Sequence, residues 1–276
     1  MEATRRIYHY TDSAGLLGII KSGTIWASDA RFLNDSTEIS YSTEEVEDRL
    51  DSLIRREEED PESPNLETFY GIKSMVSDRD MFPVFVSCFC KHPDLLGQWR
   101  AYGRRQGYAI GFDVDLLESS AAAKCADIHD PLKLFEVKYG RNSAEGKKLI
   151  QDGMNEIDRT YSGGFPGSSA YHEVLYTLLP LLAQIKHPSF HAEEEVRMVL
   201  CPYGGPPTGA IHFRASEFAL VPYLEIGFDA SSIREVIVGP GAHCEVNING
   251  VRKLLRSSGS AYSEASVTQS GAPYRC

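Results

Sequence analysis

The chain has 276 residues, a hydrophobic content of 42% and a formal net charge of -11 at pH 7. This length allows one large domain or two small ones, and the acidity disfavours a protein that binds nucleic acid mainly by neutralising phosphates. The six cysteines form no C-x-x-C pair and are too few for a disulfide scaffold, so we expect reduced thiols. The N-terminus lacks the apolar core of a signal peptide, and no apolar run approaches the roughly 18 residues of a membrane helix. These features predict a cytoplasmic protein without a membrane partner.

The first 30 residues predict a strand, a helix and a second strand. Residues 7–11 are β-branched and aromatic, which is typical of a strand. Asp12 or Ser13 can cap the helix that follows, and Gly23 can end it. Residues 24–28 then return as the second strand.

The rest of the chain alternates irregularly between short strands and helices. Residues 31–40 predict a loop, and the acidic stretch after it keeps one apolar stripe, which indicates a solvated amphipathic helix within a helical insertion at about 43–80. Helices are also predicted between residues 94 and 106, at 171–186 with a bend at Pro180, and near 247–256. Strands are predicted at residues 81–90, 107–115, 133–140, 193–202, 210–214, 223–228, 233–240 and 265–270.

The predicted strands outnumber the helices and do not alternate with them one for one. This pattern favours an α+β fold with antiparallel sheets over a doubly wound parallel fold. No internal repeat and no long linker divides the chain. We therefore expect a single domain over residues 1–276, with the helical insertion and peripheral helices around the sheet.

The most informative polar stretch is "FHAEEEVRMVL". In a strand, Glu193, Glu195 and Arg197 would share one face, and the apolar neighbours make this an interior strand whose charges need a cleft or a partner. A solvated face with an ion pair explains the spacing equally well. A pair of carboxylates also suits chemistry in which one stabilises positive charge developing on a sugar and the other orients a nucleophile.

Two further groups have alternative structural interpretations. His9 shares a strand face with Thr11, but a histidine early in a strand is more often a hydrogen-bonded core residue than a ligand. Trp99 and Tyr102 are three residues apart on a helical turn and are also more often core than a binding platform.

A zinc site was considered because Cys88, Cys90 and His92 would share a strand face, and His187 and His191 have H-x-x-x-H spacing. However, C-x-C-x-H is not a usual zinc spacing, and Pro188 interrupts the helix that H-x-x-x-H requires. We therefore expect no metal.

Taken together, the motifs resemble an uncharacterised bacterial family known only as a domain of unknown function (family 2971). The matching stretches are Tyr8–Thr11, Asn34–Glu38, Cys88–Phe112, Glu193–Arg197, Val238–Pro240 and Pro273–Arg275. The likeness extends over almost the whole chain and is specific as a set, but it implies no activity.

The opening "YHYT" with "GTIWAS" is also similar to the first motif of the ADP-ribosyltransferase superfamily, in particular the DNA-modifying toxins and the tRNA 2'-phosphotransferases. That resemblance implies a split antiparallel sheet and NAD as substrate. It implies that His9 contacts the nicotinamide-side ribose, that Thr11 is a neighbouring hydrogen-bond partner, and that Glu195 and Glu193 are the catalytic carboxylates of an E-x-E motif. The E-x-E subgroup normally opens with an arginine and carries S-T-S, where this chain has His9 and Cys88-Phe89-Cys90.

On this hypothesis, further residues would line the NAD site. Tyr10, Trp99 or Tyr102 would stack on nicotinamide, and Arg100 or Arg197 would bind the pyrophosphate. Ser28 and Asn34 complete the expected NAD-binding set.

The sequence therefore predicts an NAD-dependent ADP-ribosyltransferase that modifies a nucleic acid or protein, as a toxin or phage-defence effector, with an antitoxin or other partner protein possible. The alternative is a non-catalytic module of the same fold that binds a nucleotide or a protein in defence or stress signalling. A nuclease-like or deaminase-like enzyme is a third option and would require zinc.

Overall fold

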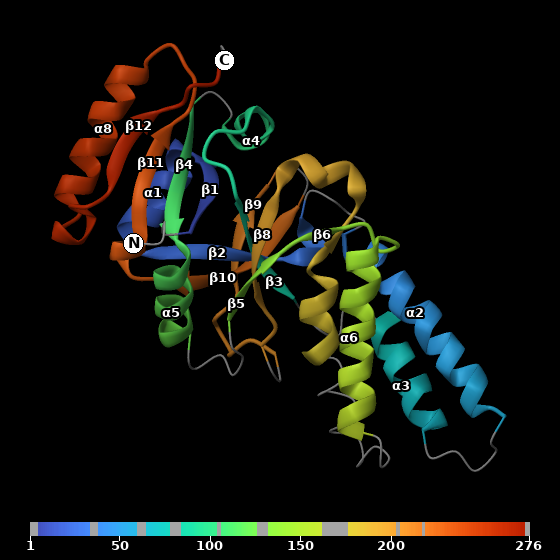
Figure 1. Ribbon diagram of the computed structural model, residues 1–276. Helices are drawn as coiled ribbons and strands as arrows, with labels where there is room; N and C mark the ends of the chain where they lie inside the picture. Colours follow the sequence, from blue (N-terminus) through green and yellow to red (C-terminus); the bar gives the residue numbers. More distant parts are fainter. Residues whose placement is uncertain are drawn as a thin grey trace.

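The computed structural model describes residues 5–33, 38–59, 65–77, 84–103, 106–125, 132–161, 176–202, 205–216 and 219–273 (Figure 1). Helices and strands are interspersed along the chain, and the strands form one large, mostly antiparallel sheet. The predicted α+β class is therefore confirmed. No helix in these ranges is both long and apolar enough to cross a membrane.

The large sheet contains ten strands, and a separate pair is formed by two short ones. In chain order the strands are β1 (Arg6–Asp12), β2 (Thr24–Asp29), β3 (Phe85–Cys90), β4 (Gly107–Asp113), β5 (Lys133–Glu136), β6 (Lys138–Tyr139), β7 (Ile185–Lys186), β8 (Glu195–Leu200), β9 (His212–Ala215), β10 (Leu220–Gly227), β11 (Ile233–Val238) and β12 (Ser266–Gln269).

The α-helices differ in how they pack: α1, α5 and α8 lie around one part of the sheet, while α2, α3 and α6 gather at the opposite end of the molecule (Figure 1). The α-helices are α1 (Ser13–Ser22), α2 (Glu38–Glu57), α3 (Leu66–Ser77), α4 (Leu96–Tyr102), α5 (Val114–Lys124), α6 (Ala144–Tyr161), residues 176–182, and α8 (Cys244–Ser257). The 3-10 helices are η1 (Ala30–Phe32), η2 (Pro188–Glu193), η3 (Ala230–Ser232) and η4 (Ser260–Tyr262).

The sheet runs in the order β12-β11-β4-β1-β3-β2-β10-β9, and β8 joins it by pairing with β3 and β5. All of these pairings are antiparallel except β11 with β12. The strand β3 therefore contacts three partners: β8 along its whole length, β1 at Cys90, and β2 at Phe85 and Val86. Between its contacts with β1 and β2, one edge of β3 is free of a strand.

The two sides of the sheet are covered by different helices. On one side, apolar residues of α1, α5 and α8 pack against Phe85, Phe89, Val196 and Met198. On the other side, residues of α2, α3, α6 and 176–182 pack against Val86 and Val199. We call these the first and second faces of the sheet. Each face of β3 and β8 is buried, which explains their nearly continuous apolar sequence.

The structure corrects two local predictions around the acidic motif. The helix predicted at 171–186 does not reach residue 186, because Ile185 and Lys186 form β7 and pair in parallel with β6. Glu193 lies in η2 and not on the same strand as Glu195, since β8 begins at Glu195. The helical periodicity of the sequence could not show the hydrogen bonds that Lys138 and Gly140 donate to residues 184 and 186.

Within the predicted helical insertion, α2 and α3 pack against each other and bury Val46, Leu50 and Ile72 in the second face. The segment is therefore helical as predicted, although α2 starts at Glu38, ahead of the predicted start. Its apolar stripe packs on the sheet, while the acidic residues occupy the other side of α2.

Backbone packing around Trp99 gives a testable constraint on the fold. A Cβ on Gly107 would lie 2.5 Å from the Gly103 Cα and 3.1 Å from the Trp99 ring, so Gly107→Ala should destabilise the protein by about 1–3 kcal/mol. Gly18, within α1, has no neighbour within 4 Å of such a Cβ, and Gly18→Ala should stabilise by about 0.5–1 kcal/mol. Urea unfolding of both variants measures the difference, and equal stabilities would contradict the packing around Trp99.

Candidate functional site

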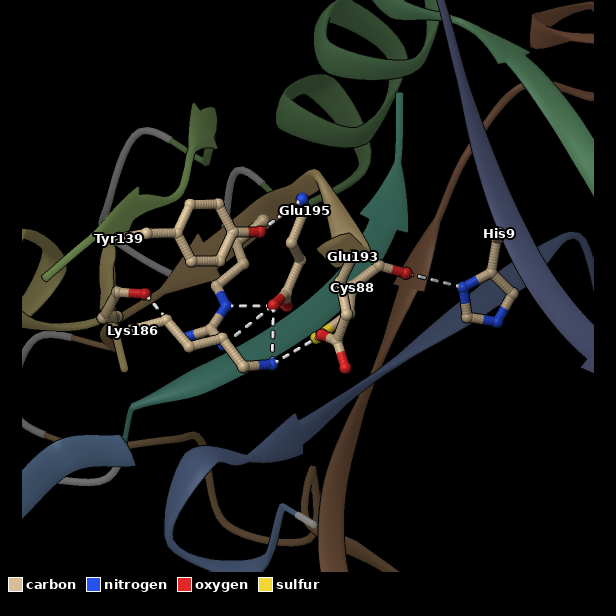
Figure 2. Close-up of polar contacts among 8 residues, drawn as sticks. His9, Cys88, Tyr139, Lys186, Glu193 and Glu195 are labelled. Atoms are coloured by element: carbon tan, nitrogen blue, oxygen red, sulfur yellow. Dashed lines mark hydrogen bonds and ion pairs between the residues drawn. The ribbon is translucent and has the colours of Figure 1, made fainter. Parts of the chain in front are cut away.

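The strand β3 holds the two parts of the predicted site next to each other. The His9 Nδ1 atom on β1 lies 2.9 Å from the Cys88 carbonyl oxygen, in the part of the β3 edge that no strand covers (Figure 2). The Cys88 side chain, in turn, lies close enough to the Glu195 carboxylate on β8 to help lower the pKa of Glu195. One residue is thus near both the imidazole and the acidic motif, which are 186 positions apart in the chain.

The surroundings of His9 define its protonation state. Burial lowers the pKa of His9, against the opposing effect of the Cys88 carbonyl, so the imidazole is neutral at pH 7. Because the carbonyl can only accept, Nδ1 carries the proton and Nε2 is left as an acceptor. No hydrogen bond to Nε2 is present among the described residues. Nε2 can therefore accept a hydrogen bond from a hydroxyl group.

Glu195 lies in a buried ion-pair cluster with two cations. Its Oε1 accepts from the Arg197 Nε at 2.8 Å, and its Oε2 accepts from the Lys186 Nζ at 2.9 Å (Figure 2). The Glu195 side chain is only 5% exposed. Arg197 also donates to the Ala183 carbonyl at 2.8 Å, and the Glu195 amide donates to the Tyr139 hydroxyl at 2.8 Å. Both carboxylate oxygens and the backbone amide of Glu195 thus have protein partners.

The cations determine the charge of Glu195. Burial raises its pKa, but the Arg197 guanidinium and the Lys186 ammonium outweigh this and lower the pKa to about 2. Glu195 is therefore ionised at neutral pH. Burial raises the pKa of Tyr139 to about 12, so this tyrosine stays a neutral hydrogen-bonding group.

Glu193 provides a second and more accessible carboxylate. Its Oε2 lies 2.8 Å from the Lys186 Nζ, and its side chain is 29% exposed. Lys186 therefore holds both predicted catalytic glutamates, although one lies in η2 and the other in β8. The Lys186 ammonium also lies 4.7 Å from the centre of the Phe190 ring. With Arg197, the cluster contains two carboxylates and two cations.

The side chains of His9 and Glu195 leave the sheet on different faces. Cys90 is paired with Glu195, and Cys88 with Arg197, so all four project to the second face. The His9 ring instead packs edge-on against Phe89, at 5.8 Å between ring centres, and Phe89 projects to the first face. The hydrogen bond of His9 is made with the backbone of β3, at the part of its edge between β1 and β2.

The other predicted residues lie at various depths. Tyr10 and Trp99 are buried in one apolar cluster and pack edge-on, with ring centres 4.7 Å apart, which is a core arrangement. Tyr102 on α4 is partly exposed, and its phenol is close enough to Glu193, Glu195 and Lys186 for their charges to influence it. Arg100 is exposed on α4.

Three predicted residues lie away from the acidic cluster or outside the described ranges. Thr11 lies two residues after His9 on β1, and Ser28 on β2 is buried and accepts a hydrogen bond from Arg214. Asn34 lies outside the described residues, as do Tyr274 and Arg275 of the C-terminal motif.

The zinc alternative gains no support from the side-chain geometry. In the part of the chain that the structure describes, no group of three or more His, Cys, Asp or Glu side chains is arranged to hold a metal ion. Cys90 accepts from the His92 amide, and the His92 imidazole lies 2.8 Å from the Glu194 carboxylate.

Sequence reasoning missed Lys186, Cys88 and Tyr139 as members of this site. Lys186 was predicted to end a helix, and Cys88 was predicted as a core, zinc or family-motif residue without a role beside the glutamates. A signal was present, because a buried acidic motif with a single arginine requires a second cation, and Lys186 follows the apolar run "LLAQI" directly.

Comparison with known proteins supports the family resemblance. Residues 98–198 match the model of a family described as a protein of unknown function (DUF2971). The matched segment includes most of α4 and Lys186, Glu193 and Glu195, whereas β1 with His9 and β3 with Cys88 lie outside it. Neither the curated proteins nor the solved structures gave a significant match to the chain.

The ion-pair cluster predicts an acid-sensitive contribution to stability. The difference between the ordinary pKa of 4.5 and about 2 for Glu195 corresponds to about 3 kcal/mol of folding free energy. This contribution is complete above pH 4.5 and is lost as the pH falls towards 2, because protonation removes the charge that the cations stabilise.

We therefore expect Glu195→Gln to be about 3 kcal/mol less stable than the wild type at pH 7, with the deficit shrinking as the pH falls below 4.5. Urea unfolding across this pH range measures the deficit. The control is Glu194→Gln, because Glu194 is exposed and its variant should stay within about 0.5 kcal/mol of the wild type. A deficit that is independent of pH would contradict the ionised cluster.

Proposed function

We propose that the chain is an NAD-dependent ADP-ribosyltransferase whose site lies around β3. The observation that carries the proposal is the position of Cys88, whose carbonyl oxygen lies 2.9 Å from the His9 Nδ1 atom and whose side chain lies close enough to Glu195 to help lower its pKa. The first-motif histidine on β1 and Glu195 on β8 therefore flank the same strand, β3, and the resemblance to the ADP-ribosyltransferase superfamily supports a shared site there. A split antiparallel sheet of that type is part of this proposal.

In the proposed reaction, the bond between the nicotinamide nitrogen and ribose C1' breaks, and its electron pair leaves with nicotinamide. Positive charge then develops on the ribose, and an ionised carboxylate next to it lowers the barrier. Glu195 is ionised at neutral pH and supplies this charge. The neutral His9 accepts a hydrogen bond from a ribose hydroxyl at Nε2.

The acceptor then forms a bond with C1', and Glu193 takes the proton that the acceptor loses. Glu193 is the carboxylate that an incoming group reaches first, because its side chain is 29% exposed and Glu195 is 5% exposed. Direct contact between Glu195 and the ribose requires Lys186 to release one carboxylate oxygen. Tyr102 lies within the range of the charges of both glutamates and would provide an aromatic surface for nicotinamide.

A specific observation also favours a non-catalytic module of the same fold. Glu195 and Arg197 are both almost fully buried and bind each other through two hydrogen bonds. An ion pair of this kind is able to stabilise β8 without any role in catalysis. On this second proposal, the site binds a nucleotide or a protein and releases no nicotinamide.

Release of nicotinamide from NAD separates the two proposals. For the transferase, Glu195→Gln and Glu193→Gln should each lower the rate of release by about 10²–10³-fold, because a charge next to the ribose or the proton acceptor is lost. Glu194→Gln should retain the wild-type rate, since Glu194 binds His92 and neither Lys186 nor Arg197.

Circular dichroism on each variant checks that the fold is kept, and Glu193→Gln tests the site even if Glu195→Gln unfolds. Full activity in a folded Glu193→Gln and a folded Glu195→Gln variant would contradict the transferase. Calorimetric binding of NAD by the wild type without release of nicotinamide would support the module.

A further inference from the structure

A row of stacked rings crosses three strands of the sheet. Trp26 on β2, Tyr223 on β10 and His212 on β9 come from three neighbouring strands, which lie side by side in Figure 1. The ring centres of Trp26 and Tyr223 are 4.3 Å apart, and those of Tyr223 and His212 are 5.5 Å apart, with both pairs nearly parallel. We call these three residues the aromatic row.

The outer members of the aromatic row face solvent. Trp26 is 45% exposed and His212 is also exposed, whereas Tyr223 is buried between them. A half-exposed tryptophan gives up part of the stabilisation that full burial of its ring would provide. Cross-strand stacking on Tyr223 alone therefore does not explain why Trp26 is exposed. An aromatic ring that stacks on Trp26 or His212 would continue the row.

Next to the aromatic row lies Arg214, a cation for which the described residues provide no acidic partner. Arg214 is two residues after His212 on β9 and donates a hydrogen bond of 3.3 Å to the Ser28 hydroxyl. No carboxylate in the described ranges forms an ion pair with it, and burial lowers its pKa. Its guanidinium is thus partly desolvated without a compensating anion, and an anionic group bound there would restore the lost interaction.

The aromatic row lies on the same face of the sheet as the acidic cluster. Ser28 pairs with Val86, and side chains two residues apart share a face, so Trp26 and Cys88 project to the second face. Glu195 and Arg197 project to that face from β8. The helices of the second face pack over β3 and β8, and the aromatic row on β2, β10 and β9 is not among the residues they bury.

We infer that the aromatic row and Arg214 bind single-stranded nucleic acid. Exposed rings on a sheet surface stack with unpaired bases, and a neighbouring guanidinium binds the phosphate that links them. Glu225 pairs with Trp26 across the strands and repels phosphate there, so the phosphate lies at the Arg214 end and a base lies on Trp26. On the proposed function, the bound nucleic acid would also be the acceptor of ADP-ribose, and only this step rests on that function.

Recognition through stacking is compatible with the acidity of the chain. A net charge of -11 opposes binding that depends on many phosphate contacts. Here a single arginine binds phosphate and the rings supply most of the affinity. The affinity for a single strand should therefore depend only weakly on salt, with a slope of about -0.7 in a plot of log K against log salt concentration.

Fluorescence anisotropy with short labelled single-stranded DNA and RNA, in the absence of NAD, tests the inference. Trp26→Ala should weaken binding by about 5- to 150-fold, and Trp26→Phe should recover most of it, because a ring is restored. Arg214→Gln should weaken binding and remove most of the salt dependence. Trp26 is half exposed and Arg214 is only partly buried, so these variants should fold.

The matched control is Phe213→Ala. Phe213 lies between His212 and Arg214 on β9 and is 64% exposed, but it projects to the other face and its loss should leave the affinity unchanged. A duplex of the same sequence should bind more weakly than the single strand, since its bases are not free to stack. Binding of the single-stranded oligonucleotide should quench the fluorescence of Trp26. In Trp26→Phe the remaining tryptophan is Trp99, which is 2% exposed, and its fluorescence should not change.

The outcomes distinguish this inference from the proposed function. Absence of binding to every oligonucleotide, or equal losses in Phe213→Ala and Trp26→Ala, would overturn it even if nicotinamide is released. If Trp26→Ala raises the KM for NAD and leaves oligonucleotide affinity unchanged, the row binds the dinucleotide and the inference is wrong. Tight binding of oligonucleotides without nicotinamide release would keep it and refute the transferase.

Discussion

The arrangement of the molecule depends on the strand β3 and on how its two edges are used. One edge pairs with β8 along its whole length, and the other is shared by β1 and β2, which bind it at opposite ends. Between them, backbone groups of β3 and β2 must find partners outside the strand ladder, since unpaired buried groups are costly. The His9 imidazole binds the Cys88 carbonyl, and the Ser87 hydroxyl donates to the Trp26 carbonyl at 2.7 Å. Residues of the candidate site thus supply hydrogen bonds to backbone groups that lack a partner in the strand ladder.

The same arrangement explains why charges occur within the core. Glu195 and Arg197 project from a strand whose neighbours are buried on both sides, so neither charge is stable there alone. The chain places Lys186 against them by pairing β7 with β6, and the resulting cluster has no net charge. Removal of any one member leaves an unbalanced charge in an environment that water does not solvate well. The free-energy penalty of that charge is larger than the stability that the intact cluster contributes. A catalytic role for Glu195 and a structural role for it therefore use the same contacts.

The unequal covering of the second face separates two surfaces with different chemistry. Helices α2, α3 and α6 pack over β3 and β8 and shield the charged cluster. The aromatic row on β2, β10 and β9 is exposed at Trp26 and His212, next to an arginine that forms no ion pair with any carboxylate of the described residues. The second face thus carries a largely covered charged cluster and an open aromatic surface.

The sequence determined the local elements of this protein and the pairs of residues that share a strand. Alternating and β-branched runs predicted β1, β3, β4 and β8, and Asp12 and Gly23 predicted the ends of α1, where both act as caps. These features depend on neighbours within a few residues, so the sequence contains them directly. The α+β class followed from their order, and the acidic motif was recognised as needing partners.

Only the tertiary structure decided which residues are the partners of the acidic motif. Lys186 is nine residues from Glu195 and was predicted to end a helix, but hydrogen bonds from Lys138 and Gly140 draw it into a strand. The contact between His9 and Cys88, and the stacking of Trp26, Tyr223 and His212, join segments far apart in the chain. Such contacts depend on which strands are adjacent and in what register, and periodicity in a single sequence carries no information about either.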